Sequence, residues 1–322
     1  MTNNRRRFIK NASIAATALS LAGKGFGNVL QSESIIKKPK MKSTSSISVF
    51  SKNLHWLSIN DMANAVAEMG FDGIDLTVRP NGHILPENVV EELPKAVEAI
   101  RKKGLEVYMI TTAIANAEDT FTEPILRTAG SLGIPFYRMG WLEYNNKINR
   151  EDNVEVFRKQ LTELGRLGEK HNIKGAYQNH AGTSFGSAVL DLYMELKNVH
   201  SKWIGCQYDI RHATVEGANS WTVGLDFIKP HINTINLKDF NWATTGGKTR
   251  EQNVPLGTGN VDFEKYVNYL KEMSFNGPVC LHFEYPLGGA EDGAKKIIIP
   301  AGEVFKAMRK DLEIARTWFA ST

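Results

Sequence analysis

Short apolar runs alternate with longer amphipathic segments along most of this chain. Eight runs are rich in β-branched and aromatic residues and have the length of strands. They predict strands at Ile47–Phe50, Gly73–Val78, Glu106–Thr111, Phe136–Gly140, Gly175–Asn179, Ile204–Asp209, Thr234–Lys238 and Val279–Tyr285. Segments with apolar residues three to four positions apart predict helices at Ile59–Met69, Val89–Lys103, Glu123–Leu132, Val154–His171, Ala188–Val199, Trp221–Ile228, Phe263–Met273 and Gly302–Phe319. Strict alternation of eight strands with helices favours an α/β fold, a closed parallel (β/α)8 barrel.

The carboxyl ends of the last four predicted strands are polar, although an apolar strand could simply turn there. Alternation puts His282 and Glu284 on one side of the eighth strand, with Glu284 at its carboxyl end. The fifth, sixth and seventh strands end in Gln178, Asn179 and His180, in Asp209, Arg211 and His212, and in Asn236, Lys238 and Asp239. Buried ionisable groups are costly unless they are paired or liganded, so these ends predict one shared polar pocket at the barrel mouth. Asn179, Arg211 and Asp239 could instead cap loops.

The second predicted strand offers further candidates for ligand binding. Asp75, Thr77 and Arg79 share one face of it, and His83 follows shortly afterwards. A role in substrate binding and a simple ion pair at the strand end are both consistent with this pattern. Trp56, Trp141 and Trp242 could act as stacking platforms for a sugar, although single tryptophans more often pack in a core or at its rim.

Charge and cysteine content narrow the function classes. The 322-residue chain carries a net charge of +4, but residues 1–45 hold nine Lys or Arg against one Glu, so the remainder is about −4. This distribution argues against a nucleic-acid-binding surface. The only two cysteines, Cys206 and Cys280, lie in apolar runs and are expected to be buried, reduced thiols, which excludes a disulfide scaffold.

The first 45 residues have the pattern of an export signal followed by a tether. Arg5 and Arg6 begin a basic segment, and a weakly apolar run follows from Ala12 to Ala22. This run is shorter than the ~20 residues of a membrane span. The paired arginines resemble a twin-arginine signal. We therefore expect a signal peptide and flexible tether over 1–45, a single barrel domain over 46–322, and a folded, periplasmic protein without a stable membrane span.

The strand endings resemble the xylose-isomerase-like sugar phosphate isomerase/epimerase superfamily. The most specific segments are Gly73–Arg79, Gln178–His180, Asp209–His212, Leu237–Asp239 and the Pro-Leu-Gly-Thr-Gly loop at 255–259. The resemblance spans roughly residues 46–319 and implies a TIM barrel with a sugar-like substrate at its mouth. It also implies a divalent ion, often Mn, Mg or Co, held by four strand-end side chains.

Two of those four positions depart from the pattern that the resemblance implies. Asp209 and Glu284 are kept, but Gln178 stands where a Glu is usual and Asn236 where a His is usual. Gln178, Asp209, Asn236 and Glu284 could still form an all-oxygen site for a hard ion. Alternatively, Lys238 places an ammonium near Asp209 and Glu284 and substitutes for the charge of the metal.

The chemistry that we expect is proton abstraction next to a carbonyl. Glu284 would be the base, and His212 or His180 would hold hydroxyls or serve as acid, a role that Lys238 could also take. Arg79, His83, Trp242 and His282 are the expected substrate-binding residues. An amide cannot be a general base, so an epimerisation with two glutamates is not expected. Isomerisation, one-sided epimerisation or a lyase reaction on a keto-glycoside all fit one carboxylate base. A non-catalytic carbohydrate-binding barrel is the competing interpretation. The expected partner is a small carbohydrate, and the sequence leaves formation of a homo-oligomer open.

Overall fold

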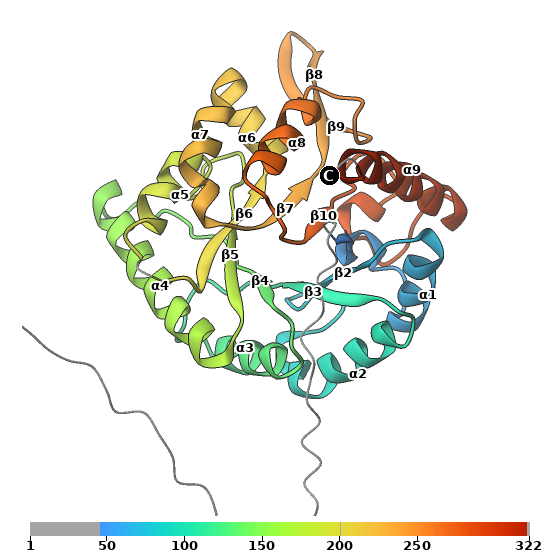
Figure 1. Ribbon diagram of the computed structural model, residues 1–322, viewed down its shortest axis with the longest axis horizontal. Helices are drawn as coiled ribbons and strands as arrows, with labels where there is room; N and C mark the ends of the chain where they lie inside the picture. Colours follow the sequence, from blue (N-terminus) through green and yellow to red (C-terminus); the bar gives the residue numbers. More distant parts are fainter. Residues whose placement is uncertain (1–45, 200, 321–322) are drawn as a thin grey trace, which may run out of the picture. The chain divides into compact units, whose positions relative to one another are not determined.

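Eight parallel strands close into a barrel in the computed structural model, which describes residues 46–199 and 201–320 (Figure 1). Around the barrel the strand order is β1-β10-β7-β6-β5-β4-β3-β2. The barrel strands are β1 (Ile47–Phe50), β2 (Gly73–Thr77), β3 (Glu106–Thr111), β4 (Phe136–Arg138), β5 (Lys174–Gln178), β6 (Ile204–Asp209), β7 (Ile232–Leu237) and β10 (Val279–Leu281). The prediction of a closed barrel is confirmed.

Helices follow the strands and form the outer ring that Figure 1 shows around the barrel. They are α1 (Ile59–Met69), α2 (Val89–Arg101), α3 (Thr122–Ser131), α4 (Arg150–His171), α5 (Val189–Leu196), α6 (Ile210–Gly217), α7 (Trp221–Ile228), α8 (Phe263–Glu272) and α9 (Ala301–Phe319). In the part of the chain that the structure describes, none of these helices has the length and apolar character needed to cross a membrane.

Local sequence explains the boundaries of α1. The Ser58 hydroxyl accepts a hydrogen bond from the Asp61 amide at 3.2 Å and caps the first turn. Gly70 ends the helix with φ of 88°, a left-handed conformation that glycine adopts without steric cost. Between these ends, Met62 and Val66 are fully buried against the barrel.

Strand register places alternate side chains inside the barrel. Asp209 of β6 pairs with Asn236 of β7, and Asn236 pairs with Cys280 of β10. Residues that pair across neighbouring strands point to the same side of the sheet, so these three side chains all point inward. Phe50 and Asp75 pair across β1 and β2 and share this inner face.

Two elements were missed by the sequence pattern. Arg211 and His212 belong to α6 and not to a strand end, because the Asp209 carboxylate accepts a hydrogen bond from the His212 amide at 3.2 Å and caps a helix that begins there.

The second missed element is an antiparallel hairpin, β8 (Asp239–Thr245) and β9 (Lys248–Val254), which follows β7. Its residues are largely polar and exposed, so it lacks the apolar alternation of a core strand. Its turn, Gly246-Gly247, has positive φ at both positions and was the available signal.

The eighth barrel strand is shorter than predicted. β10 ends at Leu281, so His282 and Glu284 lie in the segment that follows it. Buried Asn53 fixes this segment by donating to the Phe283 carbonyl at 2.7 Å and accepting from the Phe283 amide at 3.3 Å. The predicted signal peptide and tether over 1–45 lie outside the described residues.

Candidate active site

A lysine bridges two carboxylates at the carboxyl end of the barrel strands. Lys238 directly follows β7, and its Nζ lies 3.3 Å from Asp209 Oδ2 and 3.1 Å from Glu284 Oε2. Nζ is also 3.2 Å from Glu284 Oε1, so it contacts both oxygens of that carboxylate. Lys238 and Asp209 are almost completely buried, whereas the Glu284 side chain is 24% exposed. Glu284 is therefore the carboxylate of this group that a ligand in the barrel mouth can reach.

Gln178 continues this network toward the other side of the barrel. Its Nε2 donates to Asp209 Oδ2 at 2.7 Å, and its Oε1 accepts from Arg138 Nη1 at 3.0 Å. Both groups of the amide are thus engaged, one with an anion and one with a cation. Arg138 also lies over the ring of Trp141, with its guanidinium carbon 5.1 Å from the ring centroid. These contacts link four side chains in a row, and all four are buried: Arg138, Gln178, Asp209 and Lys238.

The ammonium keeps both carboxylates charged. Burial alone would raise the pKa of Glu284, but Lys238 and the neighbouring His282 hold it well below its usual range. Burial likewise opposes the charge on Asp209, and the ammonium of Lys238 lowers its pKa below that of an ordinary aspartate. At neutral pH the site therefore contains two carboxylates and one ammonium.

The histidines near this cluster are neutral at pH 7. Burial, followed by the charge of Lys238, lowers the pKa of His180 and of His212. Burial lowers the pKa of His282 to about 4, although Glu284 works in the opposite direction. The rings of His180 and His212 lie 3.8 Å apart between centroids. A neutral imidazole can donate or accept a hydrogen bond, but it is not a cationic acid.

His180 and His212 have defined hydrogen-bond partners. His180 Nδ1 donates to the Ala181 carbonyl at 2.9 Å. His212 Nδ1 accepts a hydrogen bond from Arg211 Nη1 at 3.2 Å, so the other ring nitrogen carries the hydrogen of the imidazole. That nitrogen, Nε2, is 3.8 Å from Asp209 Oδ2. At this distance His212 Nε2 makes no hydrogen bond to Asp209 and has no other partner among the described residues, while His180 keeps Nε2 as an acceptor.

The four residues predicted to hold a divalent ion do not fit one in this arrangement. The position between Asp209 and Glu284 is taken by the ammonium of Lys238. The Gln178 oxygen is turned to Arg138, and its amide nitrogen, which cannot ligate a cation, faces Asp209. Asn236 is the exception, because it is fully buried and neither atom of its amide has a hydrogen-bond partner among the described residues, so its oxygen is free to ligate. The cation of this site is therefore the protein's own ammonium.

The predicted substrate-binding residues occupy different places. Arg79 follows β2 and lines a pocket of about 630 Å³ together with Lys52, His55, Ala113, Asp292 and Lys295. His83 lies against His55, with its Nδ1 3.3 Å from the Thr77 hydroxyl, and is not among the lining residues of this pocket. Trp242 lies on β8, 48% exposed, and packs edge-on against Phe240. His282 stacks on Phe50 with ring centroids 4.3 Å apart.

Two residues of the site were not singled out by the sequence. Arg138 ends β4, and strand alternation would have placed it inside the barrel. Lys52 follows β1 in a short 3₁₀ helix (Ser51–Leu54) and also lines the pocket with Arg79. Burial lowers the pKa of Lys52, which the charge of Glu284 raises. The signal for both residues was a cation at a strand end.

Comparisons with known proteins agree with this architecture. The family model described as xylose isomerase-like TIM barrel matches residues 63–299. An uncharacterized protein of Methanocaldococcus jannaschii is 22% identical over 251 residues, which cover 70% of this chain and 78% of that protein.

Solved structures share the fold at low sequence identity. The IOLI protein, crystallised with a zinc atom, has a TM-score of 0.67 at 18% identity, covering 85% of this chain and 99% of that one. The 3-keto-D-glucoside 4-epimerase of E. coli has a TM-score of 0.63 at 15% identity, with coverage of 85% and 99%. The probable 3-DHS dehydratase of Bacillus anthracis has a TM-score of 0.63 at 16% identity, with coverage of 83% and 98%.

Proposed function

Because this chain belongs to the xylose isomerase-like TIM barrel family, we propose that it is an isomerase- or epimerase-type enzyme acting on a sugar or keto-sugar. The reaction begins with removal of a proton next to a carbonyl. The observation that carries the proposal is the Lys238 ammonium held between Asp209 and Glu284 at the barrel mouth. The epimerase and dehydratase among the structures with this fold support the same class of chemistry.

Glu284 is the proposed base. Its carboxylate is charged at neutral pH and is the exposed member of the cluster. A carboxylate with a lowered pKa is a weak base, so the C–H bond must be made more acidic by stabilising the enolate that forms. Lys238 supplies this stabilisation, because its ammonium is adjacent to Glu284 and would lie near the substrate carbonyl oxygen. Asp209 fixes the ammonium and does not touch substrate.

The geometry favours a reaction with one base. Asp209 is fully buried and already accepts from Gln178 and Lys238, so it cannot reach a second face of the substrate. Gln178 is an amide, and the neighbouring histidines are neutral hydrogen-bonding groups. Isomerisation is consistent with this arrangement, because one base can remove and return the proton on the same face. In a one-sided epimerisation, solvent at the barrel mouth would supply the proton on the opposite face. Elimination of a β-substituent from a keto-glycoside is the second candidate, favoured by the same single accessible carboxylate.

The pocket lined by Arg79 supports a polyhydroxylated substrate. Its lining includes Lys52, Arg79 and Lys295, and no ion pair within 4.0 Å involves any of the three in the described part of the chain. Burial lowers the pKa of Arg79, which Asp75 raises. These donors would bind hydroxyl or acidic groups of a sugar while its carbonyl lies at Lys238. From the N-terminal sequence we also propose export by the twin-arginine route to the periplasm.

The test is proton exchange in heavy water. The full chain is incubated with 3-keto-glucosides and with ketohexoses, and deuterium incorporation and product formation are followed by NMR and mass spectrometry. Glu284→Gln should abolish exchange, whereas Glu264→Gln, at an exposed position of α8, should leave it unchanged. Exchange by Glu284→Gln at the wild-type rate would refute the proposed base. Sugar binding by the wild type without exchange or turnover would support the non-catalytic alternative.

A further inference from the structure

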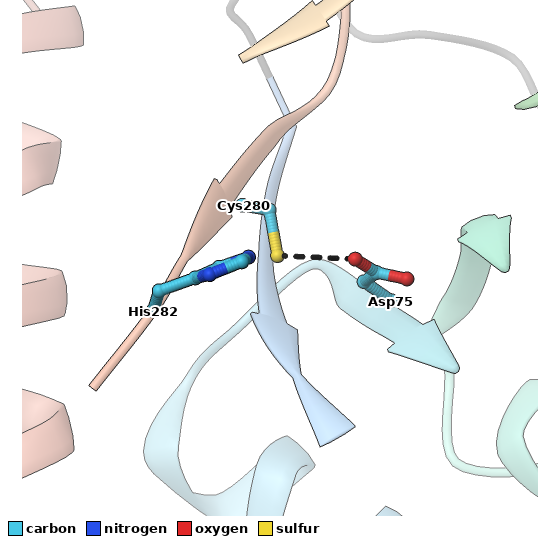
Figure 2. Close-up of side chains that lie close together, drawn as sticks. All are labelled: Asp75, Cys280 and His282. Carbon is cyan, nitrogen blue, oxygen red and sulfur yellow. Dashed lines mark hydrogen bonds between the residues drawn. The ribbon is translucent and has the colours of Figure 1, made fainter. Parts of the chain in front are cut away.

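A second group of ionisable side chains lies inside the barrel, apart from the Lys238 bridge. Asp75 of β2, Cys280 of β10 and His282 are 1%, 3% and 4% exposed. One potential ligand atom from each lies within 4.8 Å of the other two. Figure 2 shows the three side chains converging from two strands, with Cys280 between His282 and Asp75. A carboxylate, a thiol and an imidazole are the donor types found at zinc sites in proteins.

The fold holds each of these side chains in place. Cys280 and His282 are two residues apart and point inward, and β1 separates β10 from β2 in the barrel. The His282 ring is fixed by stacking on Phe50, with an interplanar angle of 18°. Thr111 Oγ1 lies 2.9 Å from each Asp75 oxygen. Cys280 Sγ lies 3.6 Å from Asp75 Oδ2.

The second observation is that His282 is buried without a hydrogen-bond partner. Neither ring nitrogen has one among the described residues, although burying an unpaired polar group is costly. Nδ1 lies 3.7 Å from Glu284 Oε1, and Figure 2 shows a ring nitrogen directed toward the Cys280 sulfur. A carboxylate beside one imidazole nitrogen, with the other nitrogen directed at further ligands, is a common arrangement around metal-binding histidines. Asn236, in register with Cys280, also has both amide atoms buried and unpartnered.

We propose that Asp75, Cys280 and His282 form a binding site for a divalent transition metal, with zinc the best match to the donor set. Ordinary Zn–S and Zn–O bonds in a tetrahedron place sulfur and oxygen about 3.5 Å apart, close to the separation of Cys280 and Asp75. A thiolate ligand disfavours Mg²⁺ and Ca²⁺, which prefer oxygen. On binding, the Cys280 thiol loses its proton to solvent, so that thiolate and carboxylate together neutralise the charge of the ion. Asn236, in register with Cys280 and with its amide unpartnered, would be the candidate for a fourth ligand.

Metal content and cobalt spectroscopy test this site independently of catalysis. The full chain is expressed with added zinc, and the metal is quantified by mass spectrometry; a second sample is loaded with Co²⁺. Wild type should contain one zinc per chain and show a thiolate-to-cobalt charge-transfer band in the near ultraviolet. Cys206→Ser is the matched control, because Cys206 is the other buried cysteine and lies on β6. It should keep both the metal and the band, and Cys280→Ser should lose both.

Two outcomes would overturn the site. Co²⁺ that binds without a thiolate band, with binding lost in Asp209→Asn, would place the ion at the Lys238 cluster. Zinc retained in Cys280→Ser would exclude the thiolate. If the serine variants do not fold, alkylation of the wild type distinguishes the two cysteines by peptide mapping. Zinc should then protect Cys280 from alkylation. Labelling of Cys280 to the same extent with and without zinc would reject the site.

Discussion

Replacing Lys238 with methionine should destabilise the protein in a way that depends on pH. The change removes the cation between Asp209 and Glu284 while keeping most of the side-chain volume. The two carboxylate oxygens that contact Nζ are no more than about 6.4 Å apart, the two Lys238 distances laid end to end. Their repulsion at this separation is about 2 to 3 kcal/mol at an effective dielectric constant of about 20. Removing one partner of a buried ion pair costs a similar amount, about 3 to 5 kcal/mol.

The sign of the pH dependence follows from the direction of the pKa shifts. In the wild type the pKa values of Asp209 and Glu284 are lowered on folding, so their stabilisation is present at neutral pH and is lost as the pH falls. Without Lys238, burial and mutual repulsion raise the pKa of at least one carboxyl above its unfolded value. The folded variant then takes up a proton, and its stability is lost as the pH rises. We therefore expect Lys238→Met to cost about 3 kcal/mol at pH 8 and clearly less at pH 5.5.

Urea unfolding followed by far-ultraviolet circular dichroism at both pH values measures this difference. Lys229→Met is the control, because Lys229 is exposed and, among the residues that the structure describes, forms an ion pair only with Asp226 at the surface. Its effect should stay within about 0.5 kcal/mol at either pH. A loss in Lys238→Met that is equal at the two pH values would show that packing, and not charge, is what the lysine contributes. The electrostatic account of the site would then be wrong.

Two further predictions concern residues that support the site. Asp239→Ala should lower the free energy of unfolding by about 1 to 3 kcal/mol in the same assay. The Asp239 carboxylate accepts hydrogen bonds from the Phe240, Gly259 and Val261 amides and so fixes the loop after β9. A loss below ~0.5 kcal/mol would contradict this role. Tyr285→Phe removes the hydroxyl that donates to Asp311 at 3.0 Å. Burial raises the pKa of Asp311 to about 6, so the loss of this bond should cost more at pH 8, where the acceptor is charged, than at pH 5. A greater loss of stability in Tyr285→Phe at pH 5 than at pH 8 would show that the hydroxyl does not favour the charged form of Asp311.

Much of the barrel could be predicted because its signals are local. Ile204–Asp209 and Glu106–Thr111 were predicted with the observed bounds, and α1 was predicted to the residue. In each case apolar periodicity coincides with a polar strand end or a glycine that ends the element. The β8–β9 hairpin could not be found in this way, because its residues contact solvent and do not alternate. α6 was missed because its capping residue, Asp209, is also the last residue of β6, and a polar residue in that position was interpreted only as a strand end.

The alternation of side chains along each strand predicted that the polar side chains at the strand ends point into the barrel. It did not predict which groups they would contact. Alternation places both Asn236 and Lys238 inside the barrel, yet a lysine there could extend to solvent or fold back onto a carboxylate. The structure directs Nζ to Asp209 and Glu284 at the same time. Gln178 has the same ambiguity, because only its contacts with Arg138 and Asp209 reveal which atom of the amide faces the lysine. Long-range contacts decide these orientations, and a sequence pattern does not contain them.

The departures at Gln178 and Asn236 are chemically coherent once Lys238 is in place. A glutamate at position 178 would add a third carboxylate to Asp209 and Glu284, and the network would then hold three carboxylates against two cations, Lys238 and Arg138. A neutral amide instead donates to Asp209 and accepts from Arg138, so that each charge in the network has a partner. The same reasoning explains why a divalent ion would not be tolerated between these carboxylates while the ammonium remains. In the proposed reaction, the cation that would stabilise the enolate is therefore covalently part of the chain, and we expect removal of Lys238 to abolish activity together with the pH-dependent part of the stability.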